Sequence, residues 1–123
     1  MQVRALSAII GCDIHPLNNR RILQYLRHEL SVDEEAVLAW CGRWMKEGFD
    51  ALEKRLANDK TRGKFCYGNH PTFADCYLIP QVSSARRFKV DLSAYPNIVE
   101  IDTHCRTLKA FADADPMVQP DAP

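Results

Sequence analysis

The side chains best suited to bind a ligand are concentrated in one run, residues 13–21, inside an otherwise apolar stretch with helical periodicity. The run contains a carboxylate, an imidazole, two carboxamides and two guanidinium groups, carried by Asp13, His15, Asn18, Asn19, Arg20 and Arg21. Guanidinium groups pair with carboxylates, and carboxamides both donate to and accept from a peptide backbone. Pro16 can bend the helix that carries them. The run therefore predicts a site for a small, anionic and partly peptidic ligand.

The alternative interpretation of this run is a solvated polar face on a bent helix. Asn18 and Asn19 favour binding, because asparagine competes with the helix for backbone hydrogen bonds and weakens the helix unless its side chain has another use. Cys12 and His15 are spaced to share a helix face, as two metal ligands would be. A zinc site needs about three or four ligands, however, and no second Cys/His pair has suitable spacing. No metal is expected.

A second candidate is the arginine pair Arg86 and Arg87, at the end of a helix-like stretch. The helix macrodipole favours cations there, which is a sufficient structural explanation. Neighbouring residues are about 100° apart around a helix, so one guanidinium can pair with the protein surface while the other faces a cavity. The two residues alone do not decide which. Thr72 and Asp75, in contrast, have the spacing of a helix-capping box and are assigned to folding.

Helical periodicity predicts four main helical stretches that must position these groups. They cover 3–30, interrupted at Pro16, then 31–56, 72–88 and 95–108, with a further short turn over 108–114. Ser31 and Glu34 are expected to form the capping box of the second stretch. No alternating run of β-branched residues is long enough to predict a strand. The sequence predicts an all-α domain over residues 1–114 and an irregular tail over residues 115–123.

The composition fits one domain with a hydrophobic core. The 123 residues are 46% hydrophobic, and 16 lysines and arginines balance 16 aspartates and glutamates. Nothing in this charge balance favours nucleic acid or an anionic membrane as a partner. Five cysteines without a C-x-x-C pair indicate buried free thiols in a reducing compartment. No run is long enough to span a bilayer and no secretory signal follows Met1, so the expected location is the cytoplasm.

Several motifs together resemble one family. They are D-I-H-P-x-N-N-R-R at 13–21, T-x-A-D at 72–75, L-I-P-Q-V at 78–82 and A-R-R-F at 85–88, supported by residues 3–6, 11–12, 90–92, 95–96 and 119–121. The T-x-A-D pattern marks the glutathione transferase superfamily, and the other motifs are more specific. The chain resembles the C-terminal helical domain of zeta-class glutathione transferases, and among these the bacterial maleylpyruvate and maleylacetoacetate isomerases. This resemblance implies an all-α bundle without the N-terminal thioredoxin-like domain.

The resemblance also implies a cofactor and a reaction. Glutathione would be contacted by Asp13, Ile14, His15, Asn19, Arg20 and Arg21. Arg87 would bind a substrate carboxylate and Arg21 would assist at a second one, which makes these two arginines the predicted catalytic residues. The implied reaction is the cis–trans isomerisation of maleylpyruvate or maleylacetoacetate in the catabolism of aromatic compounds. In it, the glutathione thiolate adds to the double bond, the resulting single bond rotates, and the thiolate leaves.

Family members begin with a thioredoxin-like half that activates the glutathione sulfur. Its absence from this sequence implies a fragment or a shortened product that is inactive by itself and exposes an apolar docking surface. The predicted partners are glutathione, a small dicarboxylate, the missing domain and a second copy of the chain in a homodimer. Two alternatives stay open: a stand-alone helical interaction module without catalysis, and a general glutathione transferase.

Overall fold

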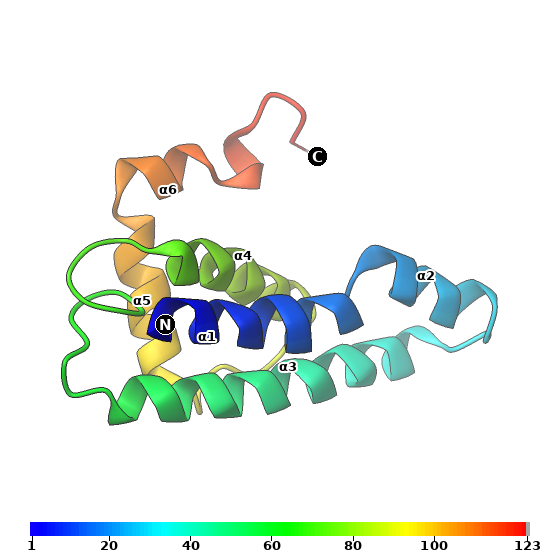
Figure 1. The fold of residues 1–123 in the computed structure, drawn as a ribbon. Helices are drawn as coiled ribbons and strands as arrows, with labels where there is room; N and C mark the ends of the chain where they lie inside the picture. The colour runs from blue at the N-terminus through cyan, green and yellow to red at the C-terminus, as the bar shows by residue number, and fades with distance from the viewer. Residues whose placement is uncertain (123) are drawn as a thin grey trace.

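The computed structural model describes residues 1–122, and these residues form helices and no strand, which confirms the predicted all-α fold. Figure 1 shows a bundle with α2 extending from one end and α6 lying on the side of α4 away from α3. In chain order the elements are α1 (Gln2–Ala8), the π-helix η1 (Ile9–Ile14), the 3-10 turn η2 (His15–Leu17), α2 (Arg20–His28), α3 (Glu34–Asn58), α4 (Phe73–Arg87), α5 (Pro96–Arg106), α6 (Lys109–Asp113) and the 3-10 turn η3 (Pro116–Val118).

The long helix α3 supplies much of the core through the apolar stripe predicted from its spacing. Its buried members are Val37, Cys41, Met45, Phe49, Leu52 and Leu56. Gly48 lies in the same stripe, and a Cβ atom at this position would overlap side-chain atoms of Ile14. The missing side chain therefore lets η1 pack directly onto α3. Within the described residues, no helix has the length and apolar character needed to cross a membrane.

The capping box predicted at the start of α4 is confirmed. The Thr72 amide donates to the Asp75 carboxylate over 2.7 Å, and the Thr72 hydroxyl lies 3.0 Å from the same oxygen. The second oxygen of this fully buried carboxylate accepts from the Cys66 amide over 2.8 Å. Asp75 therefore joins the start of α4 to the loop before it, a structural role that is sufficient for its presence.

The capping box predicted at Ser31 and Glu34 is wrong. Asp33 caps α3, and its carboxylate accepts from the Ala36 amide over 2.8 Å. Ser31 lies in the preceding turn with a φ of 51°, which is not the extended backbone of a capping residue. Glu34 pairs with Arg27 of α2 over 2.7 Å instead of reaching back to the turn. The helix was predicted correctly, and its cap was placed two positions too early.

The prediction of five buried thiols is correct for three cysteines and wrong for two. Cys41, Cys66 and Cys105 are buried, whereas Cys12 and Cys76 are exposed. Burial, together with the nearby Asp75 carboxylate, raises the pKa of the Cys105 thiol to about 12. The same two causes raise the pKa of the Cys66 thiol well above its ordinary range. These buried thiols are therefore protonated at neutral pH.

Candidate functional site

Residues 13–21 lie where the regular helix is interrupted. Pro16 has no amide hydrogen, and the turns before it widen into the π-helix η1, at whose end the His15 amide bonds to the Ile10 carbonyl. The sequence predicts the bend at Pro16 but not the π-helical turns. Such turns carry one extra residue each and are frequent at functional sites. The polar run thus begins on irregular backbone rather than on a continuous helix face.

The second half of the run forms the start of α2. Asn19 caps this helix, its side-chain oxygen accepting from the Arg21 amide over 3.1 Å. Arg20 and Arg21 therefore occupy the first turn of α2. The Trp40 indole of α3 donates to the Leu17 carbonyl over 2.6 Å and anchors the preceding turn. The Asn19 carboxamide therefore has a structural role as a cap, and its NH₂ group can still donate to a ligand.

Four of the side chains predicted to contact glutathione are exposed on this segment: Asp13, His15, Arg20 and Arg21. None of the four forms an ion pair within residues 1–122. The Ile14 side chain, in contrast, is fully buried against Gly48, which leaves only its main chain for a ligand. Within residues 1–122, no three His, Cys, Asp or Glu side chains lie close enough together to bind a metal ion.

Asn18 is a candidate that the cofactor prediction omitted. Its side chain is 7% exposed, and among the described residues its Nδ2 atom has no hydrogen-bond partner. A buried donor without an acceptor is unfavourable by about 1–3 kcal/mol, so an acceptor on a ligand would stabilise it. The sequence does contain a signal for Asn18: two asparagines are adjacent, and a helix needs only one of them, Asn19, as its cap.

The two arginines at the end of α4 have different surroundings. Arg86 Nη2 lies 2.7 Å from Oδ2 of the buried Asp102, an ion pair whose angles fall outside hydrogen-bond geometry. The Arg87 guanidinium lies 5.4 Å from the centre of the Phe88 ring, and within residues 1–122 it pairs with no carboxylate. Arg86 is therefore engaged by the protein, whereas Arg87 is available to a ligand carboxylate.

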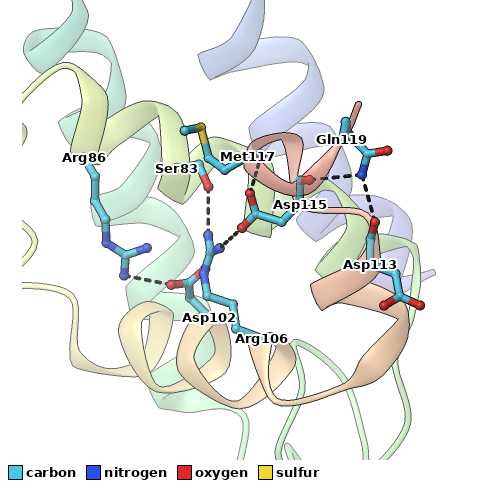
Figure 2. Close-up of polar contacts among 8 residues, drawn as sticks. All are labelled: Ser83, Arg86, Asp102, Arg106, Asp113, Asp115, Met117 and Gln119. Carbon is cyan, nitrogen blue, oxygen red and sulfur yellow. Dashed lines mark hydrogen bonds and ion pairs between the residues drawn. The ribbon is translucent and has the colours of Figure 1, made fainter. Parts of the chain in front are cut away.

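Both arginines line a groove of about 1040 Å³ between α4 and the segment that holds α6 and η3. Arg106 of α5 also lines it, donating to Ser83 Oγ over 2.7 Å and pairing with Asp115 over 3.3 Å, as Figure 2 shows. The segment predicted as an irregular tail thus contains a 3-10 turn and forms one wall of this groove. Most of the lining is apolar and includes Ile79, Pro80, Leu108, Phe111, Pro116 and Met117.

Helix packing brings the last turn of α4, which contains Arg87, to the same end of the bundle as the break in the first helical stretch. α4 lies alongside α1 and η1, and Figure 1 shows that its last turn is near the break before α2. Gly11 permits this close packing, since a Cβ atom there would lie 2.7 Å from Tyr77 Cε1 of α4. The fold therefore brings the last turn of α4, which contains Arg87, near the start of α2, which contains Arg20 and Arg21.

Comparison with known proteins identifies the family. The family model for the glutathione S-transferase C-terminal domain matches residues 34–101 of this sequence. A maleylpyruvate isomerase from Ralstonia is 59% identical over 98% of this chain, and a probable maleylacetoacetate isomerase from Vibrio cholerae is 46% identical over 98%. The chain covers 57% and 55% of these two proteins, so it spans about half the length of the curated relatives it matches.

Solved structures of relatives have the same fold. The holo structure of a maleyl pyruvate isomerase, described as a bacterial zeta-class glutathione S-transferase, superposes with a TM-score of 0.97 at 59% identity, over 98% of this chain and 57% of that one. A maleylacetoacetate isomerase from Methylobacterium extorquens with bound malonate and GSH superposes with a TM-score of 0.93 at 33% identity, over 99% and 57% of the two chains. The chain therefore belongs to the glutathione S-transferase family, as a C-terminal helical domain of the zeta class.

Proposed function

We propose that this chain is the C-terminal half of a glutathione-dependent cis–trans isomerase that acts on maleylpyruvate or maleylacetoacetate. The observation that carries the proposal is the Arg87 guanidinium, which has no carboxylate partner within residues 1–122. Arg87 belongs to the last turn of α4, which Figure 1 shows near the break before α2. Relatives named as these isomerases support it. The setting would be the catabolism of aromatic compounds in the cytoplasm.

The donors of the run fit glutathione, a peptide with two carboxylates. Arg20 and Arg21 offer guanidinium groups to a carboxylate, and the Asn19 NH₂ group can donate to a peptide carbonyl. The buried Asn18 Nδ2, which has no partner in residues 1–122, would gain one from the same kind of carbonyl. Asp13, His15 and the main chain of Ile14 complete the proposed contacts. When bound, glutathione supplies the thiol that adds to the substrate double bond.

Arg87 would bind a substrate carboxylate and stabilise the negative charge that develops on the substrate during the reaction. Its contact with the Phe88 ring restricts the guanidinium without neutralising it. A charge that is already in place needs little reorganisation when the reaction occurs, which is the main source of electrostatic catalysis. Arg21 is proposed to bind the second carboxylate, and the two arginines together would orient the substrate.

A thioredoxin-like domain would complete this site. Large apolar side chains are exposed to solvent on α4, at Phe73 (75%) and Tyr77 (44%), and in the groove lining, at Met117 (67%). We propose that such a domain covers these side chains. We infer that the chain is inactive without this half and that the complete protein is a homodimer.

The test is a fusion of this chain to the part of the Ralstonia relative that it does not match. Glutathione-dependent loss of maleylpyruvate absorbance is measured for the fusion, for the chain alone and for the Arg87→Ala fusion. We expect turnover by the fusion alone and a loss of about 100-fold or more in kcat/KM on Arg87→Ala. Arg43→Ala, at an exposed arginine of α3, is the control and should leave turnover unchanged.

Each other outcome contradicts a stated part of the proposal. A folded fusion without turnover would refute the isomerase function and favour a helical interaction module. Turnover by the chain alone would show that the second half is dispensable. Equal losses for Arg87→Ala and Arg43→Ala would remove Arg87 from the site.

A further inference from the structure

The groove between α4 and the α6–η3 segment is lined by several arginines, and not all of their guanidinium groups are available to a ligand. Three arginines and one aspartate line it, namely Arg86, Arg87, Arg106 and Asp115, so the lining residues alone carry two positive charges in excess. A fifth charged group, Asp102 of α5, lies behind this lining with its side chain 1% exposed. The charge that a ligand meets therefore depends on what Asp102 binds.

Asp102 holds two of the three arginines. Its Oδ2 lies 2.7 Å from Arg86 Nη2, and its Oδ1 accepts from Arg106 Nε over 3.0 Å, as Figure 2 shows. Arg106 also pairs with Asp115 over 3.3 Å. The positive charges of Arg86 and Arg106 are thus balanced by the negative charges of Asp102 and Asp115. Among the residues that line the groove, the remaining cation is Arg87, which pairs with no carboxylate in residues 1–122.

The burial of Asp102 makes this arrangement hard to undo. A buried carboxylate that loses its cation is unfavourable, so Arg86 is held more firmly by Asp102 than an exposed partner would hold it. Arg87 is the next residue of α4, about 100° further around the helix, and this rotation separates it from Asp102. Two adjacent arginines thereby acquire different roles.

We propose that Asp102 is a positioning residue that sets the charge of the anion site: it withholds Arg86 from the ligand, so that Arg87 alone receives a carboxylate in the groove. This inference rests on the proposed function of Arg87. One available guanidinium takes one carboxylate, so a second carboxylate of the ligand must bind elsewhere, at Arg21 in the function proposed above.

Asp102→Asn should release Arg86 and leave the groove wall in place. Arg106 keeps its bonds to Ser83 and Asp115 in this variant. The wall is further held by Gln119, whose Nε2 donates to the Asp113 and Asp115 carbonyls over 2.8 and 3.0 Å (Figure 2). The variant therefore changes the number of available guanidinium groups more than it changes the shape of the groove.

The test is an anion titration of the ¹⁵N-arginine-labelled chain at constant ionic strength, followed by the Nε–H signals, with acetate and citrate as probes. In the unmodified chain we expect both anions to shift the Arg87 signal and leave the Arg86 signal in place. In Asp102→Asn both signals should respond, and the ratio of citrate to acetate affinity should rise about fivefold or more, because a second guanidinium can engage citrate.

The controls separate the inference from a general charge effect. Glu47→Gln removes a carboxylate from the exposed Arg43 pair on α3 and changes the net charge equally, so the ratio should stay within about twofold of its original value. The double variant Arg86→Gln/Asp102→Asn should restore the original ratio. Arg86→Gln alone should leave the binding of both anions within about twofold.

The outcomes distinguish this inference from the proposed function. If neither anion shifts the Arg87 signal of the unmodified chain, the anion site is refuted and the inference with it. If Arg87 responds but Asp102→Asn behaves like Glu47→Gln, the inference alone is refuted. If Asp102→Asn does not fold, Arg86→Gln decides: weakening comparable to that of Arg87→Gln would overturn the inference, and unchanged binding would support it.

Discussion

The two central glycines of α3 should respond in opposite ways to the same substitution. A Cβ atom at Gly42 would have no atom within 4 Å apart from its chain neighbours and the backbone of its own helix, whereas a Cβ atom at Gly48 would overlap Cγ1 and Cδ1 of Ile14. Alanine is favoured over glycine in a helix interior by about 0.5–1 kcal/mol. Gly42→Ala should therefore raise the free energy of unfolding by about this amount.

At Gly48 the same gain is opposed by overpacking, which typically destabilises by about 1–3 kcal/mol. The upper half of this range applies, because Ile14 is fully buried and two of its atoms would be overlapped. The net effect of Gly48→Ala is then a loss of about 1–2.5 kcal/mol. Ile14 lies between Asp13 and His15, so its displacement should also weaken glutathione binding in the fusion protein.

Urea unfolding followed by circular dichroism measures both effects, provided that the dependence of the free energy on urea is unchanged. A double-mutant cycle tests the cause. Ile14→Ala removes the overlapped atoms at its own cost of about 2–5 kcal/mol, and in that background Gly48→Ala should no longer destabilise. Equal effects of alanine at Gly42 and Gly48, or additive effects of Gly48→Ala and Ile14→Ala, would refute the packing argument.

Three further predictions concern the cap, the thiols and the pH dependence. Asp33→Ala should lower the urea-derived stability by about 1 kcal/mol, whereas Ser31→Ala should change it by less than about 0.5 kcal/mol; the reverse order would restore Ser31 as the cap. In the native chain a thiol reagent should modify Cys12 and Cys76 rapidly and the three other cysteines only on unfolding. Because burial raises the pKa of Cys105 to about 12, the folded chain retains a proton that the unfolded thiol loses above about pH 9. Stability should therefore decline as the pH rises from about 9 toward 12, and less steeply in Cys105→Ala; an equal slope in both would contradict this.

The sequence could predict those elements that depend on long, regular periodicity. The apolar stripe of α3 repeats over many turns, and the structure buries most of it. The cap of the same helix depends on one backbone angle. Ser31 and Asp33 are both good capping residues, and the φ of 51° at Ser31, set by the turn from α2, decides between them. Such a choice is made by tertiary packing and leaves little trace in the local sequence.

The site shows the same division between local and tertiary information. That Arg86 and Arg87 must face different directions follows from helix geometry, but which one is free depends on Asp102, which is on another helix. A signal was nevertheless present: Ile98, Ile101 and Cys105 form the buried face of α5, and Asp102 has the spacing of that same face. A carboxylate at a core position requires a buried or half-buried cation partner. Arg86 and Arg106 share that role, so Arg87 is the arginine that we propose binds the ligand.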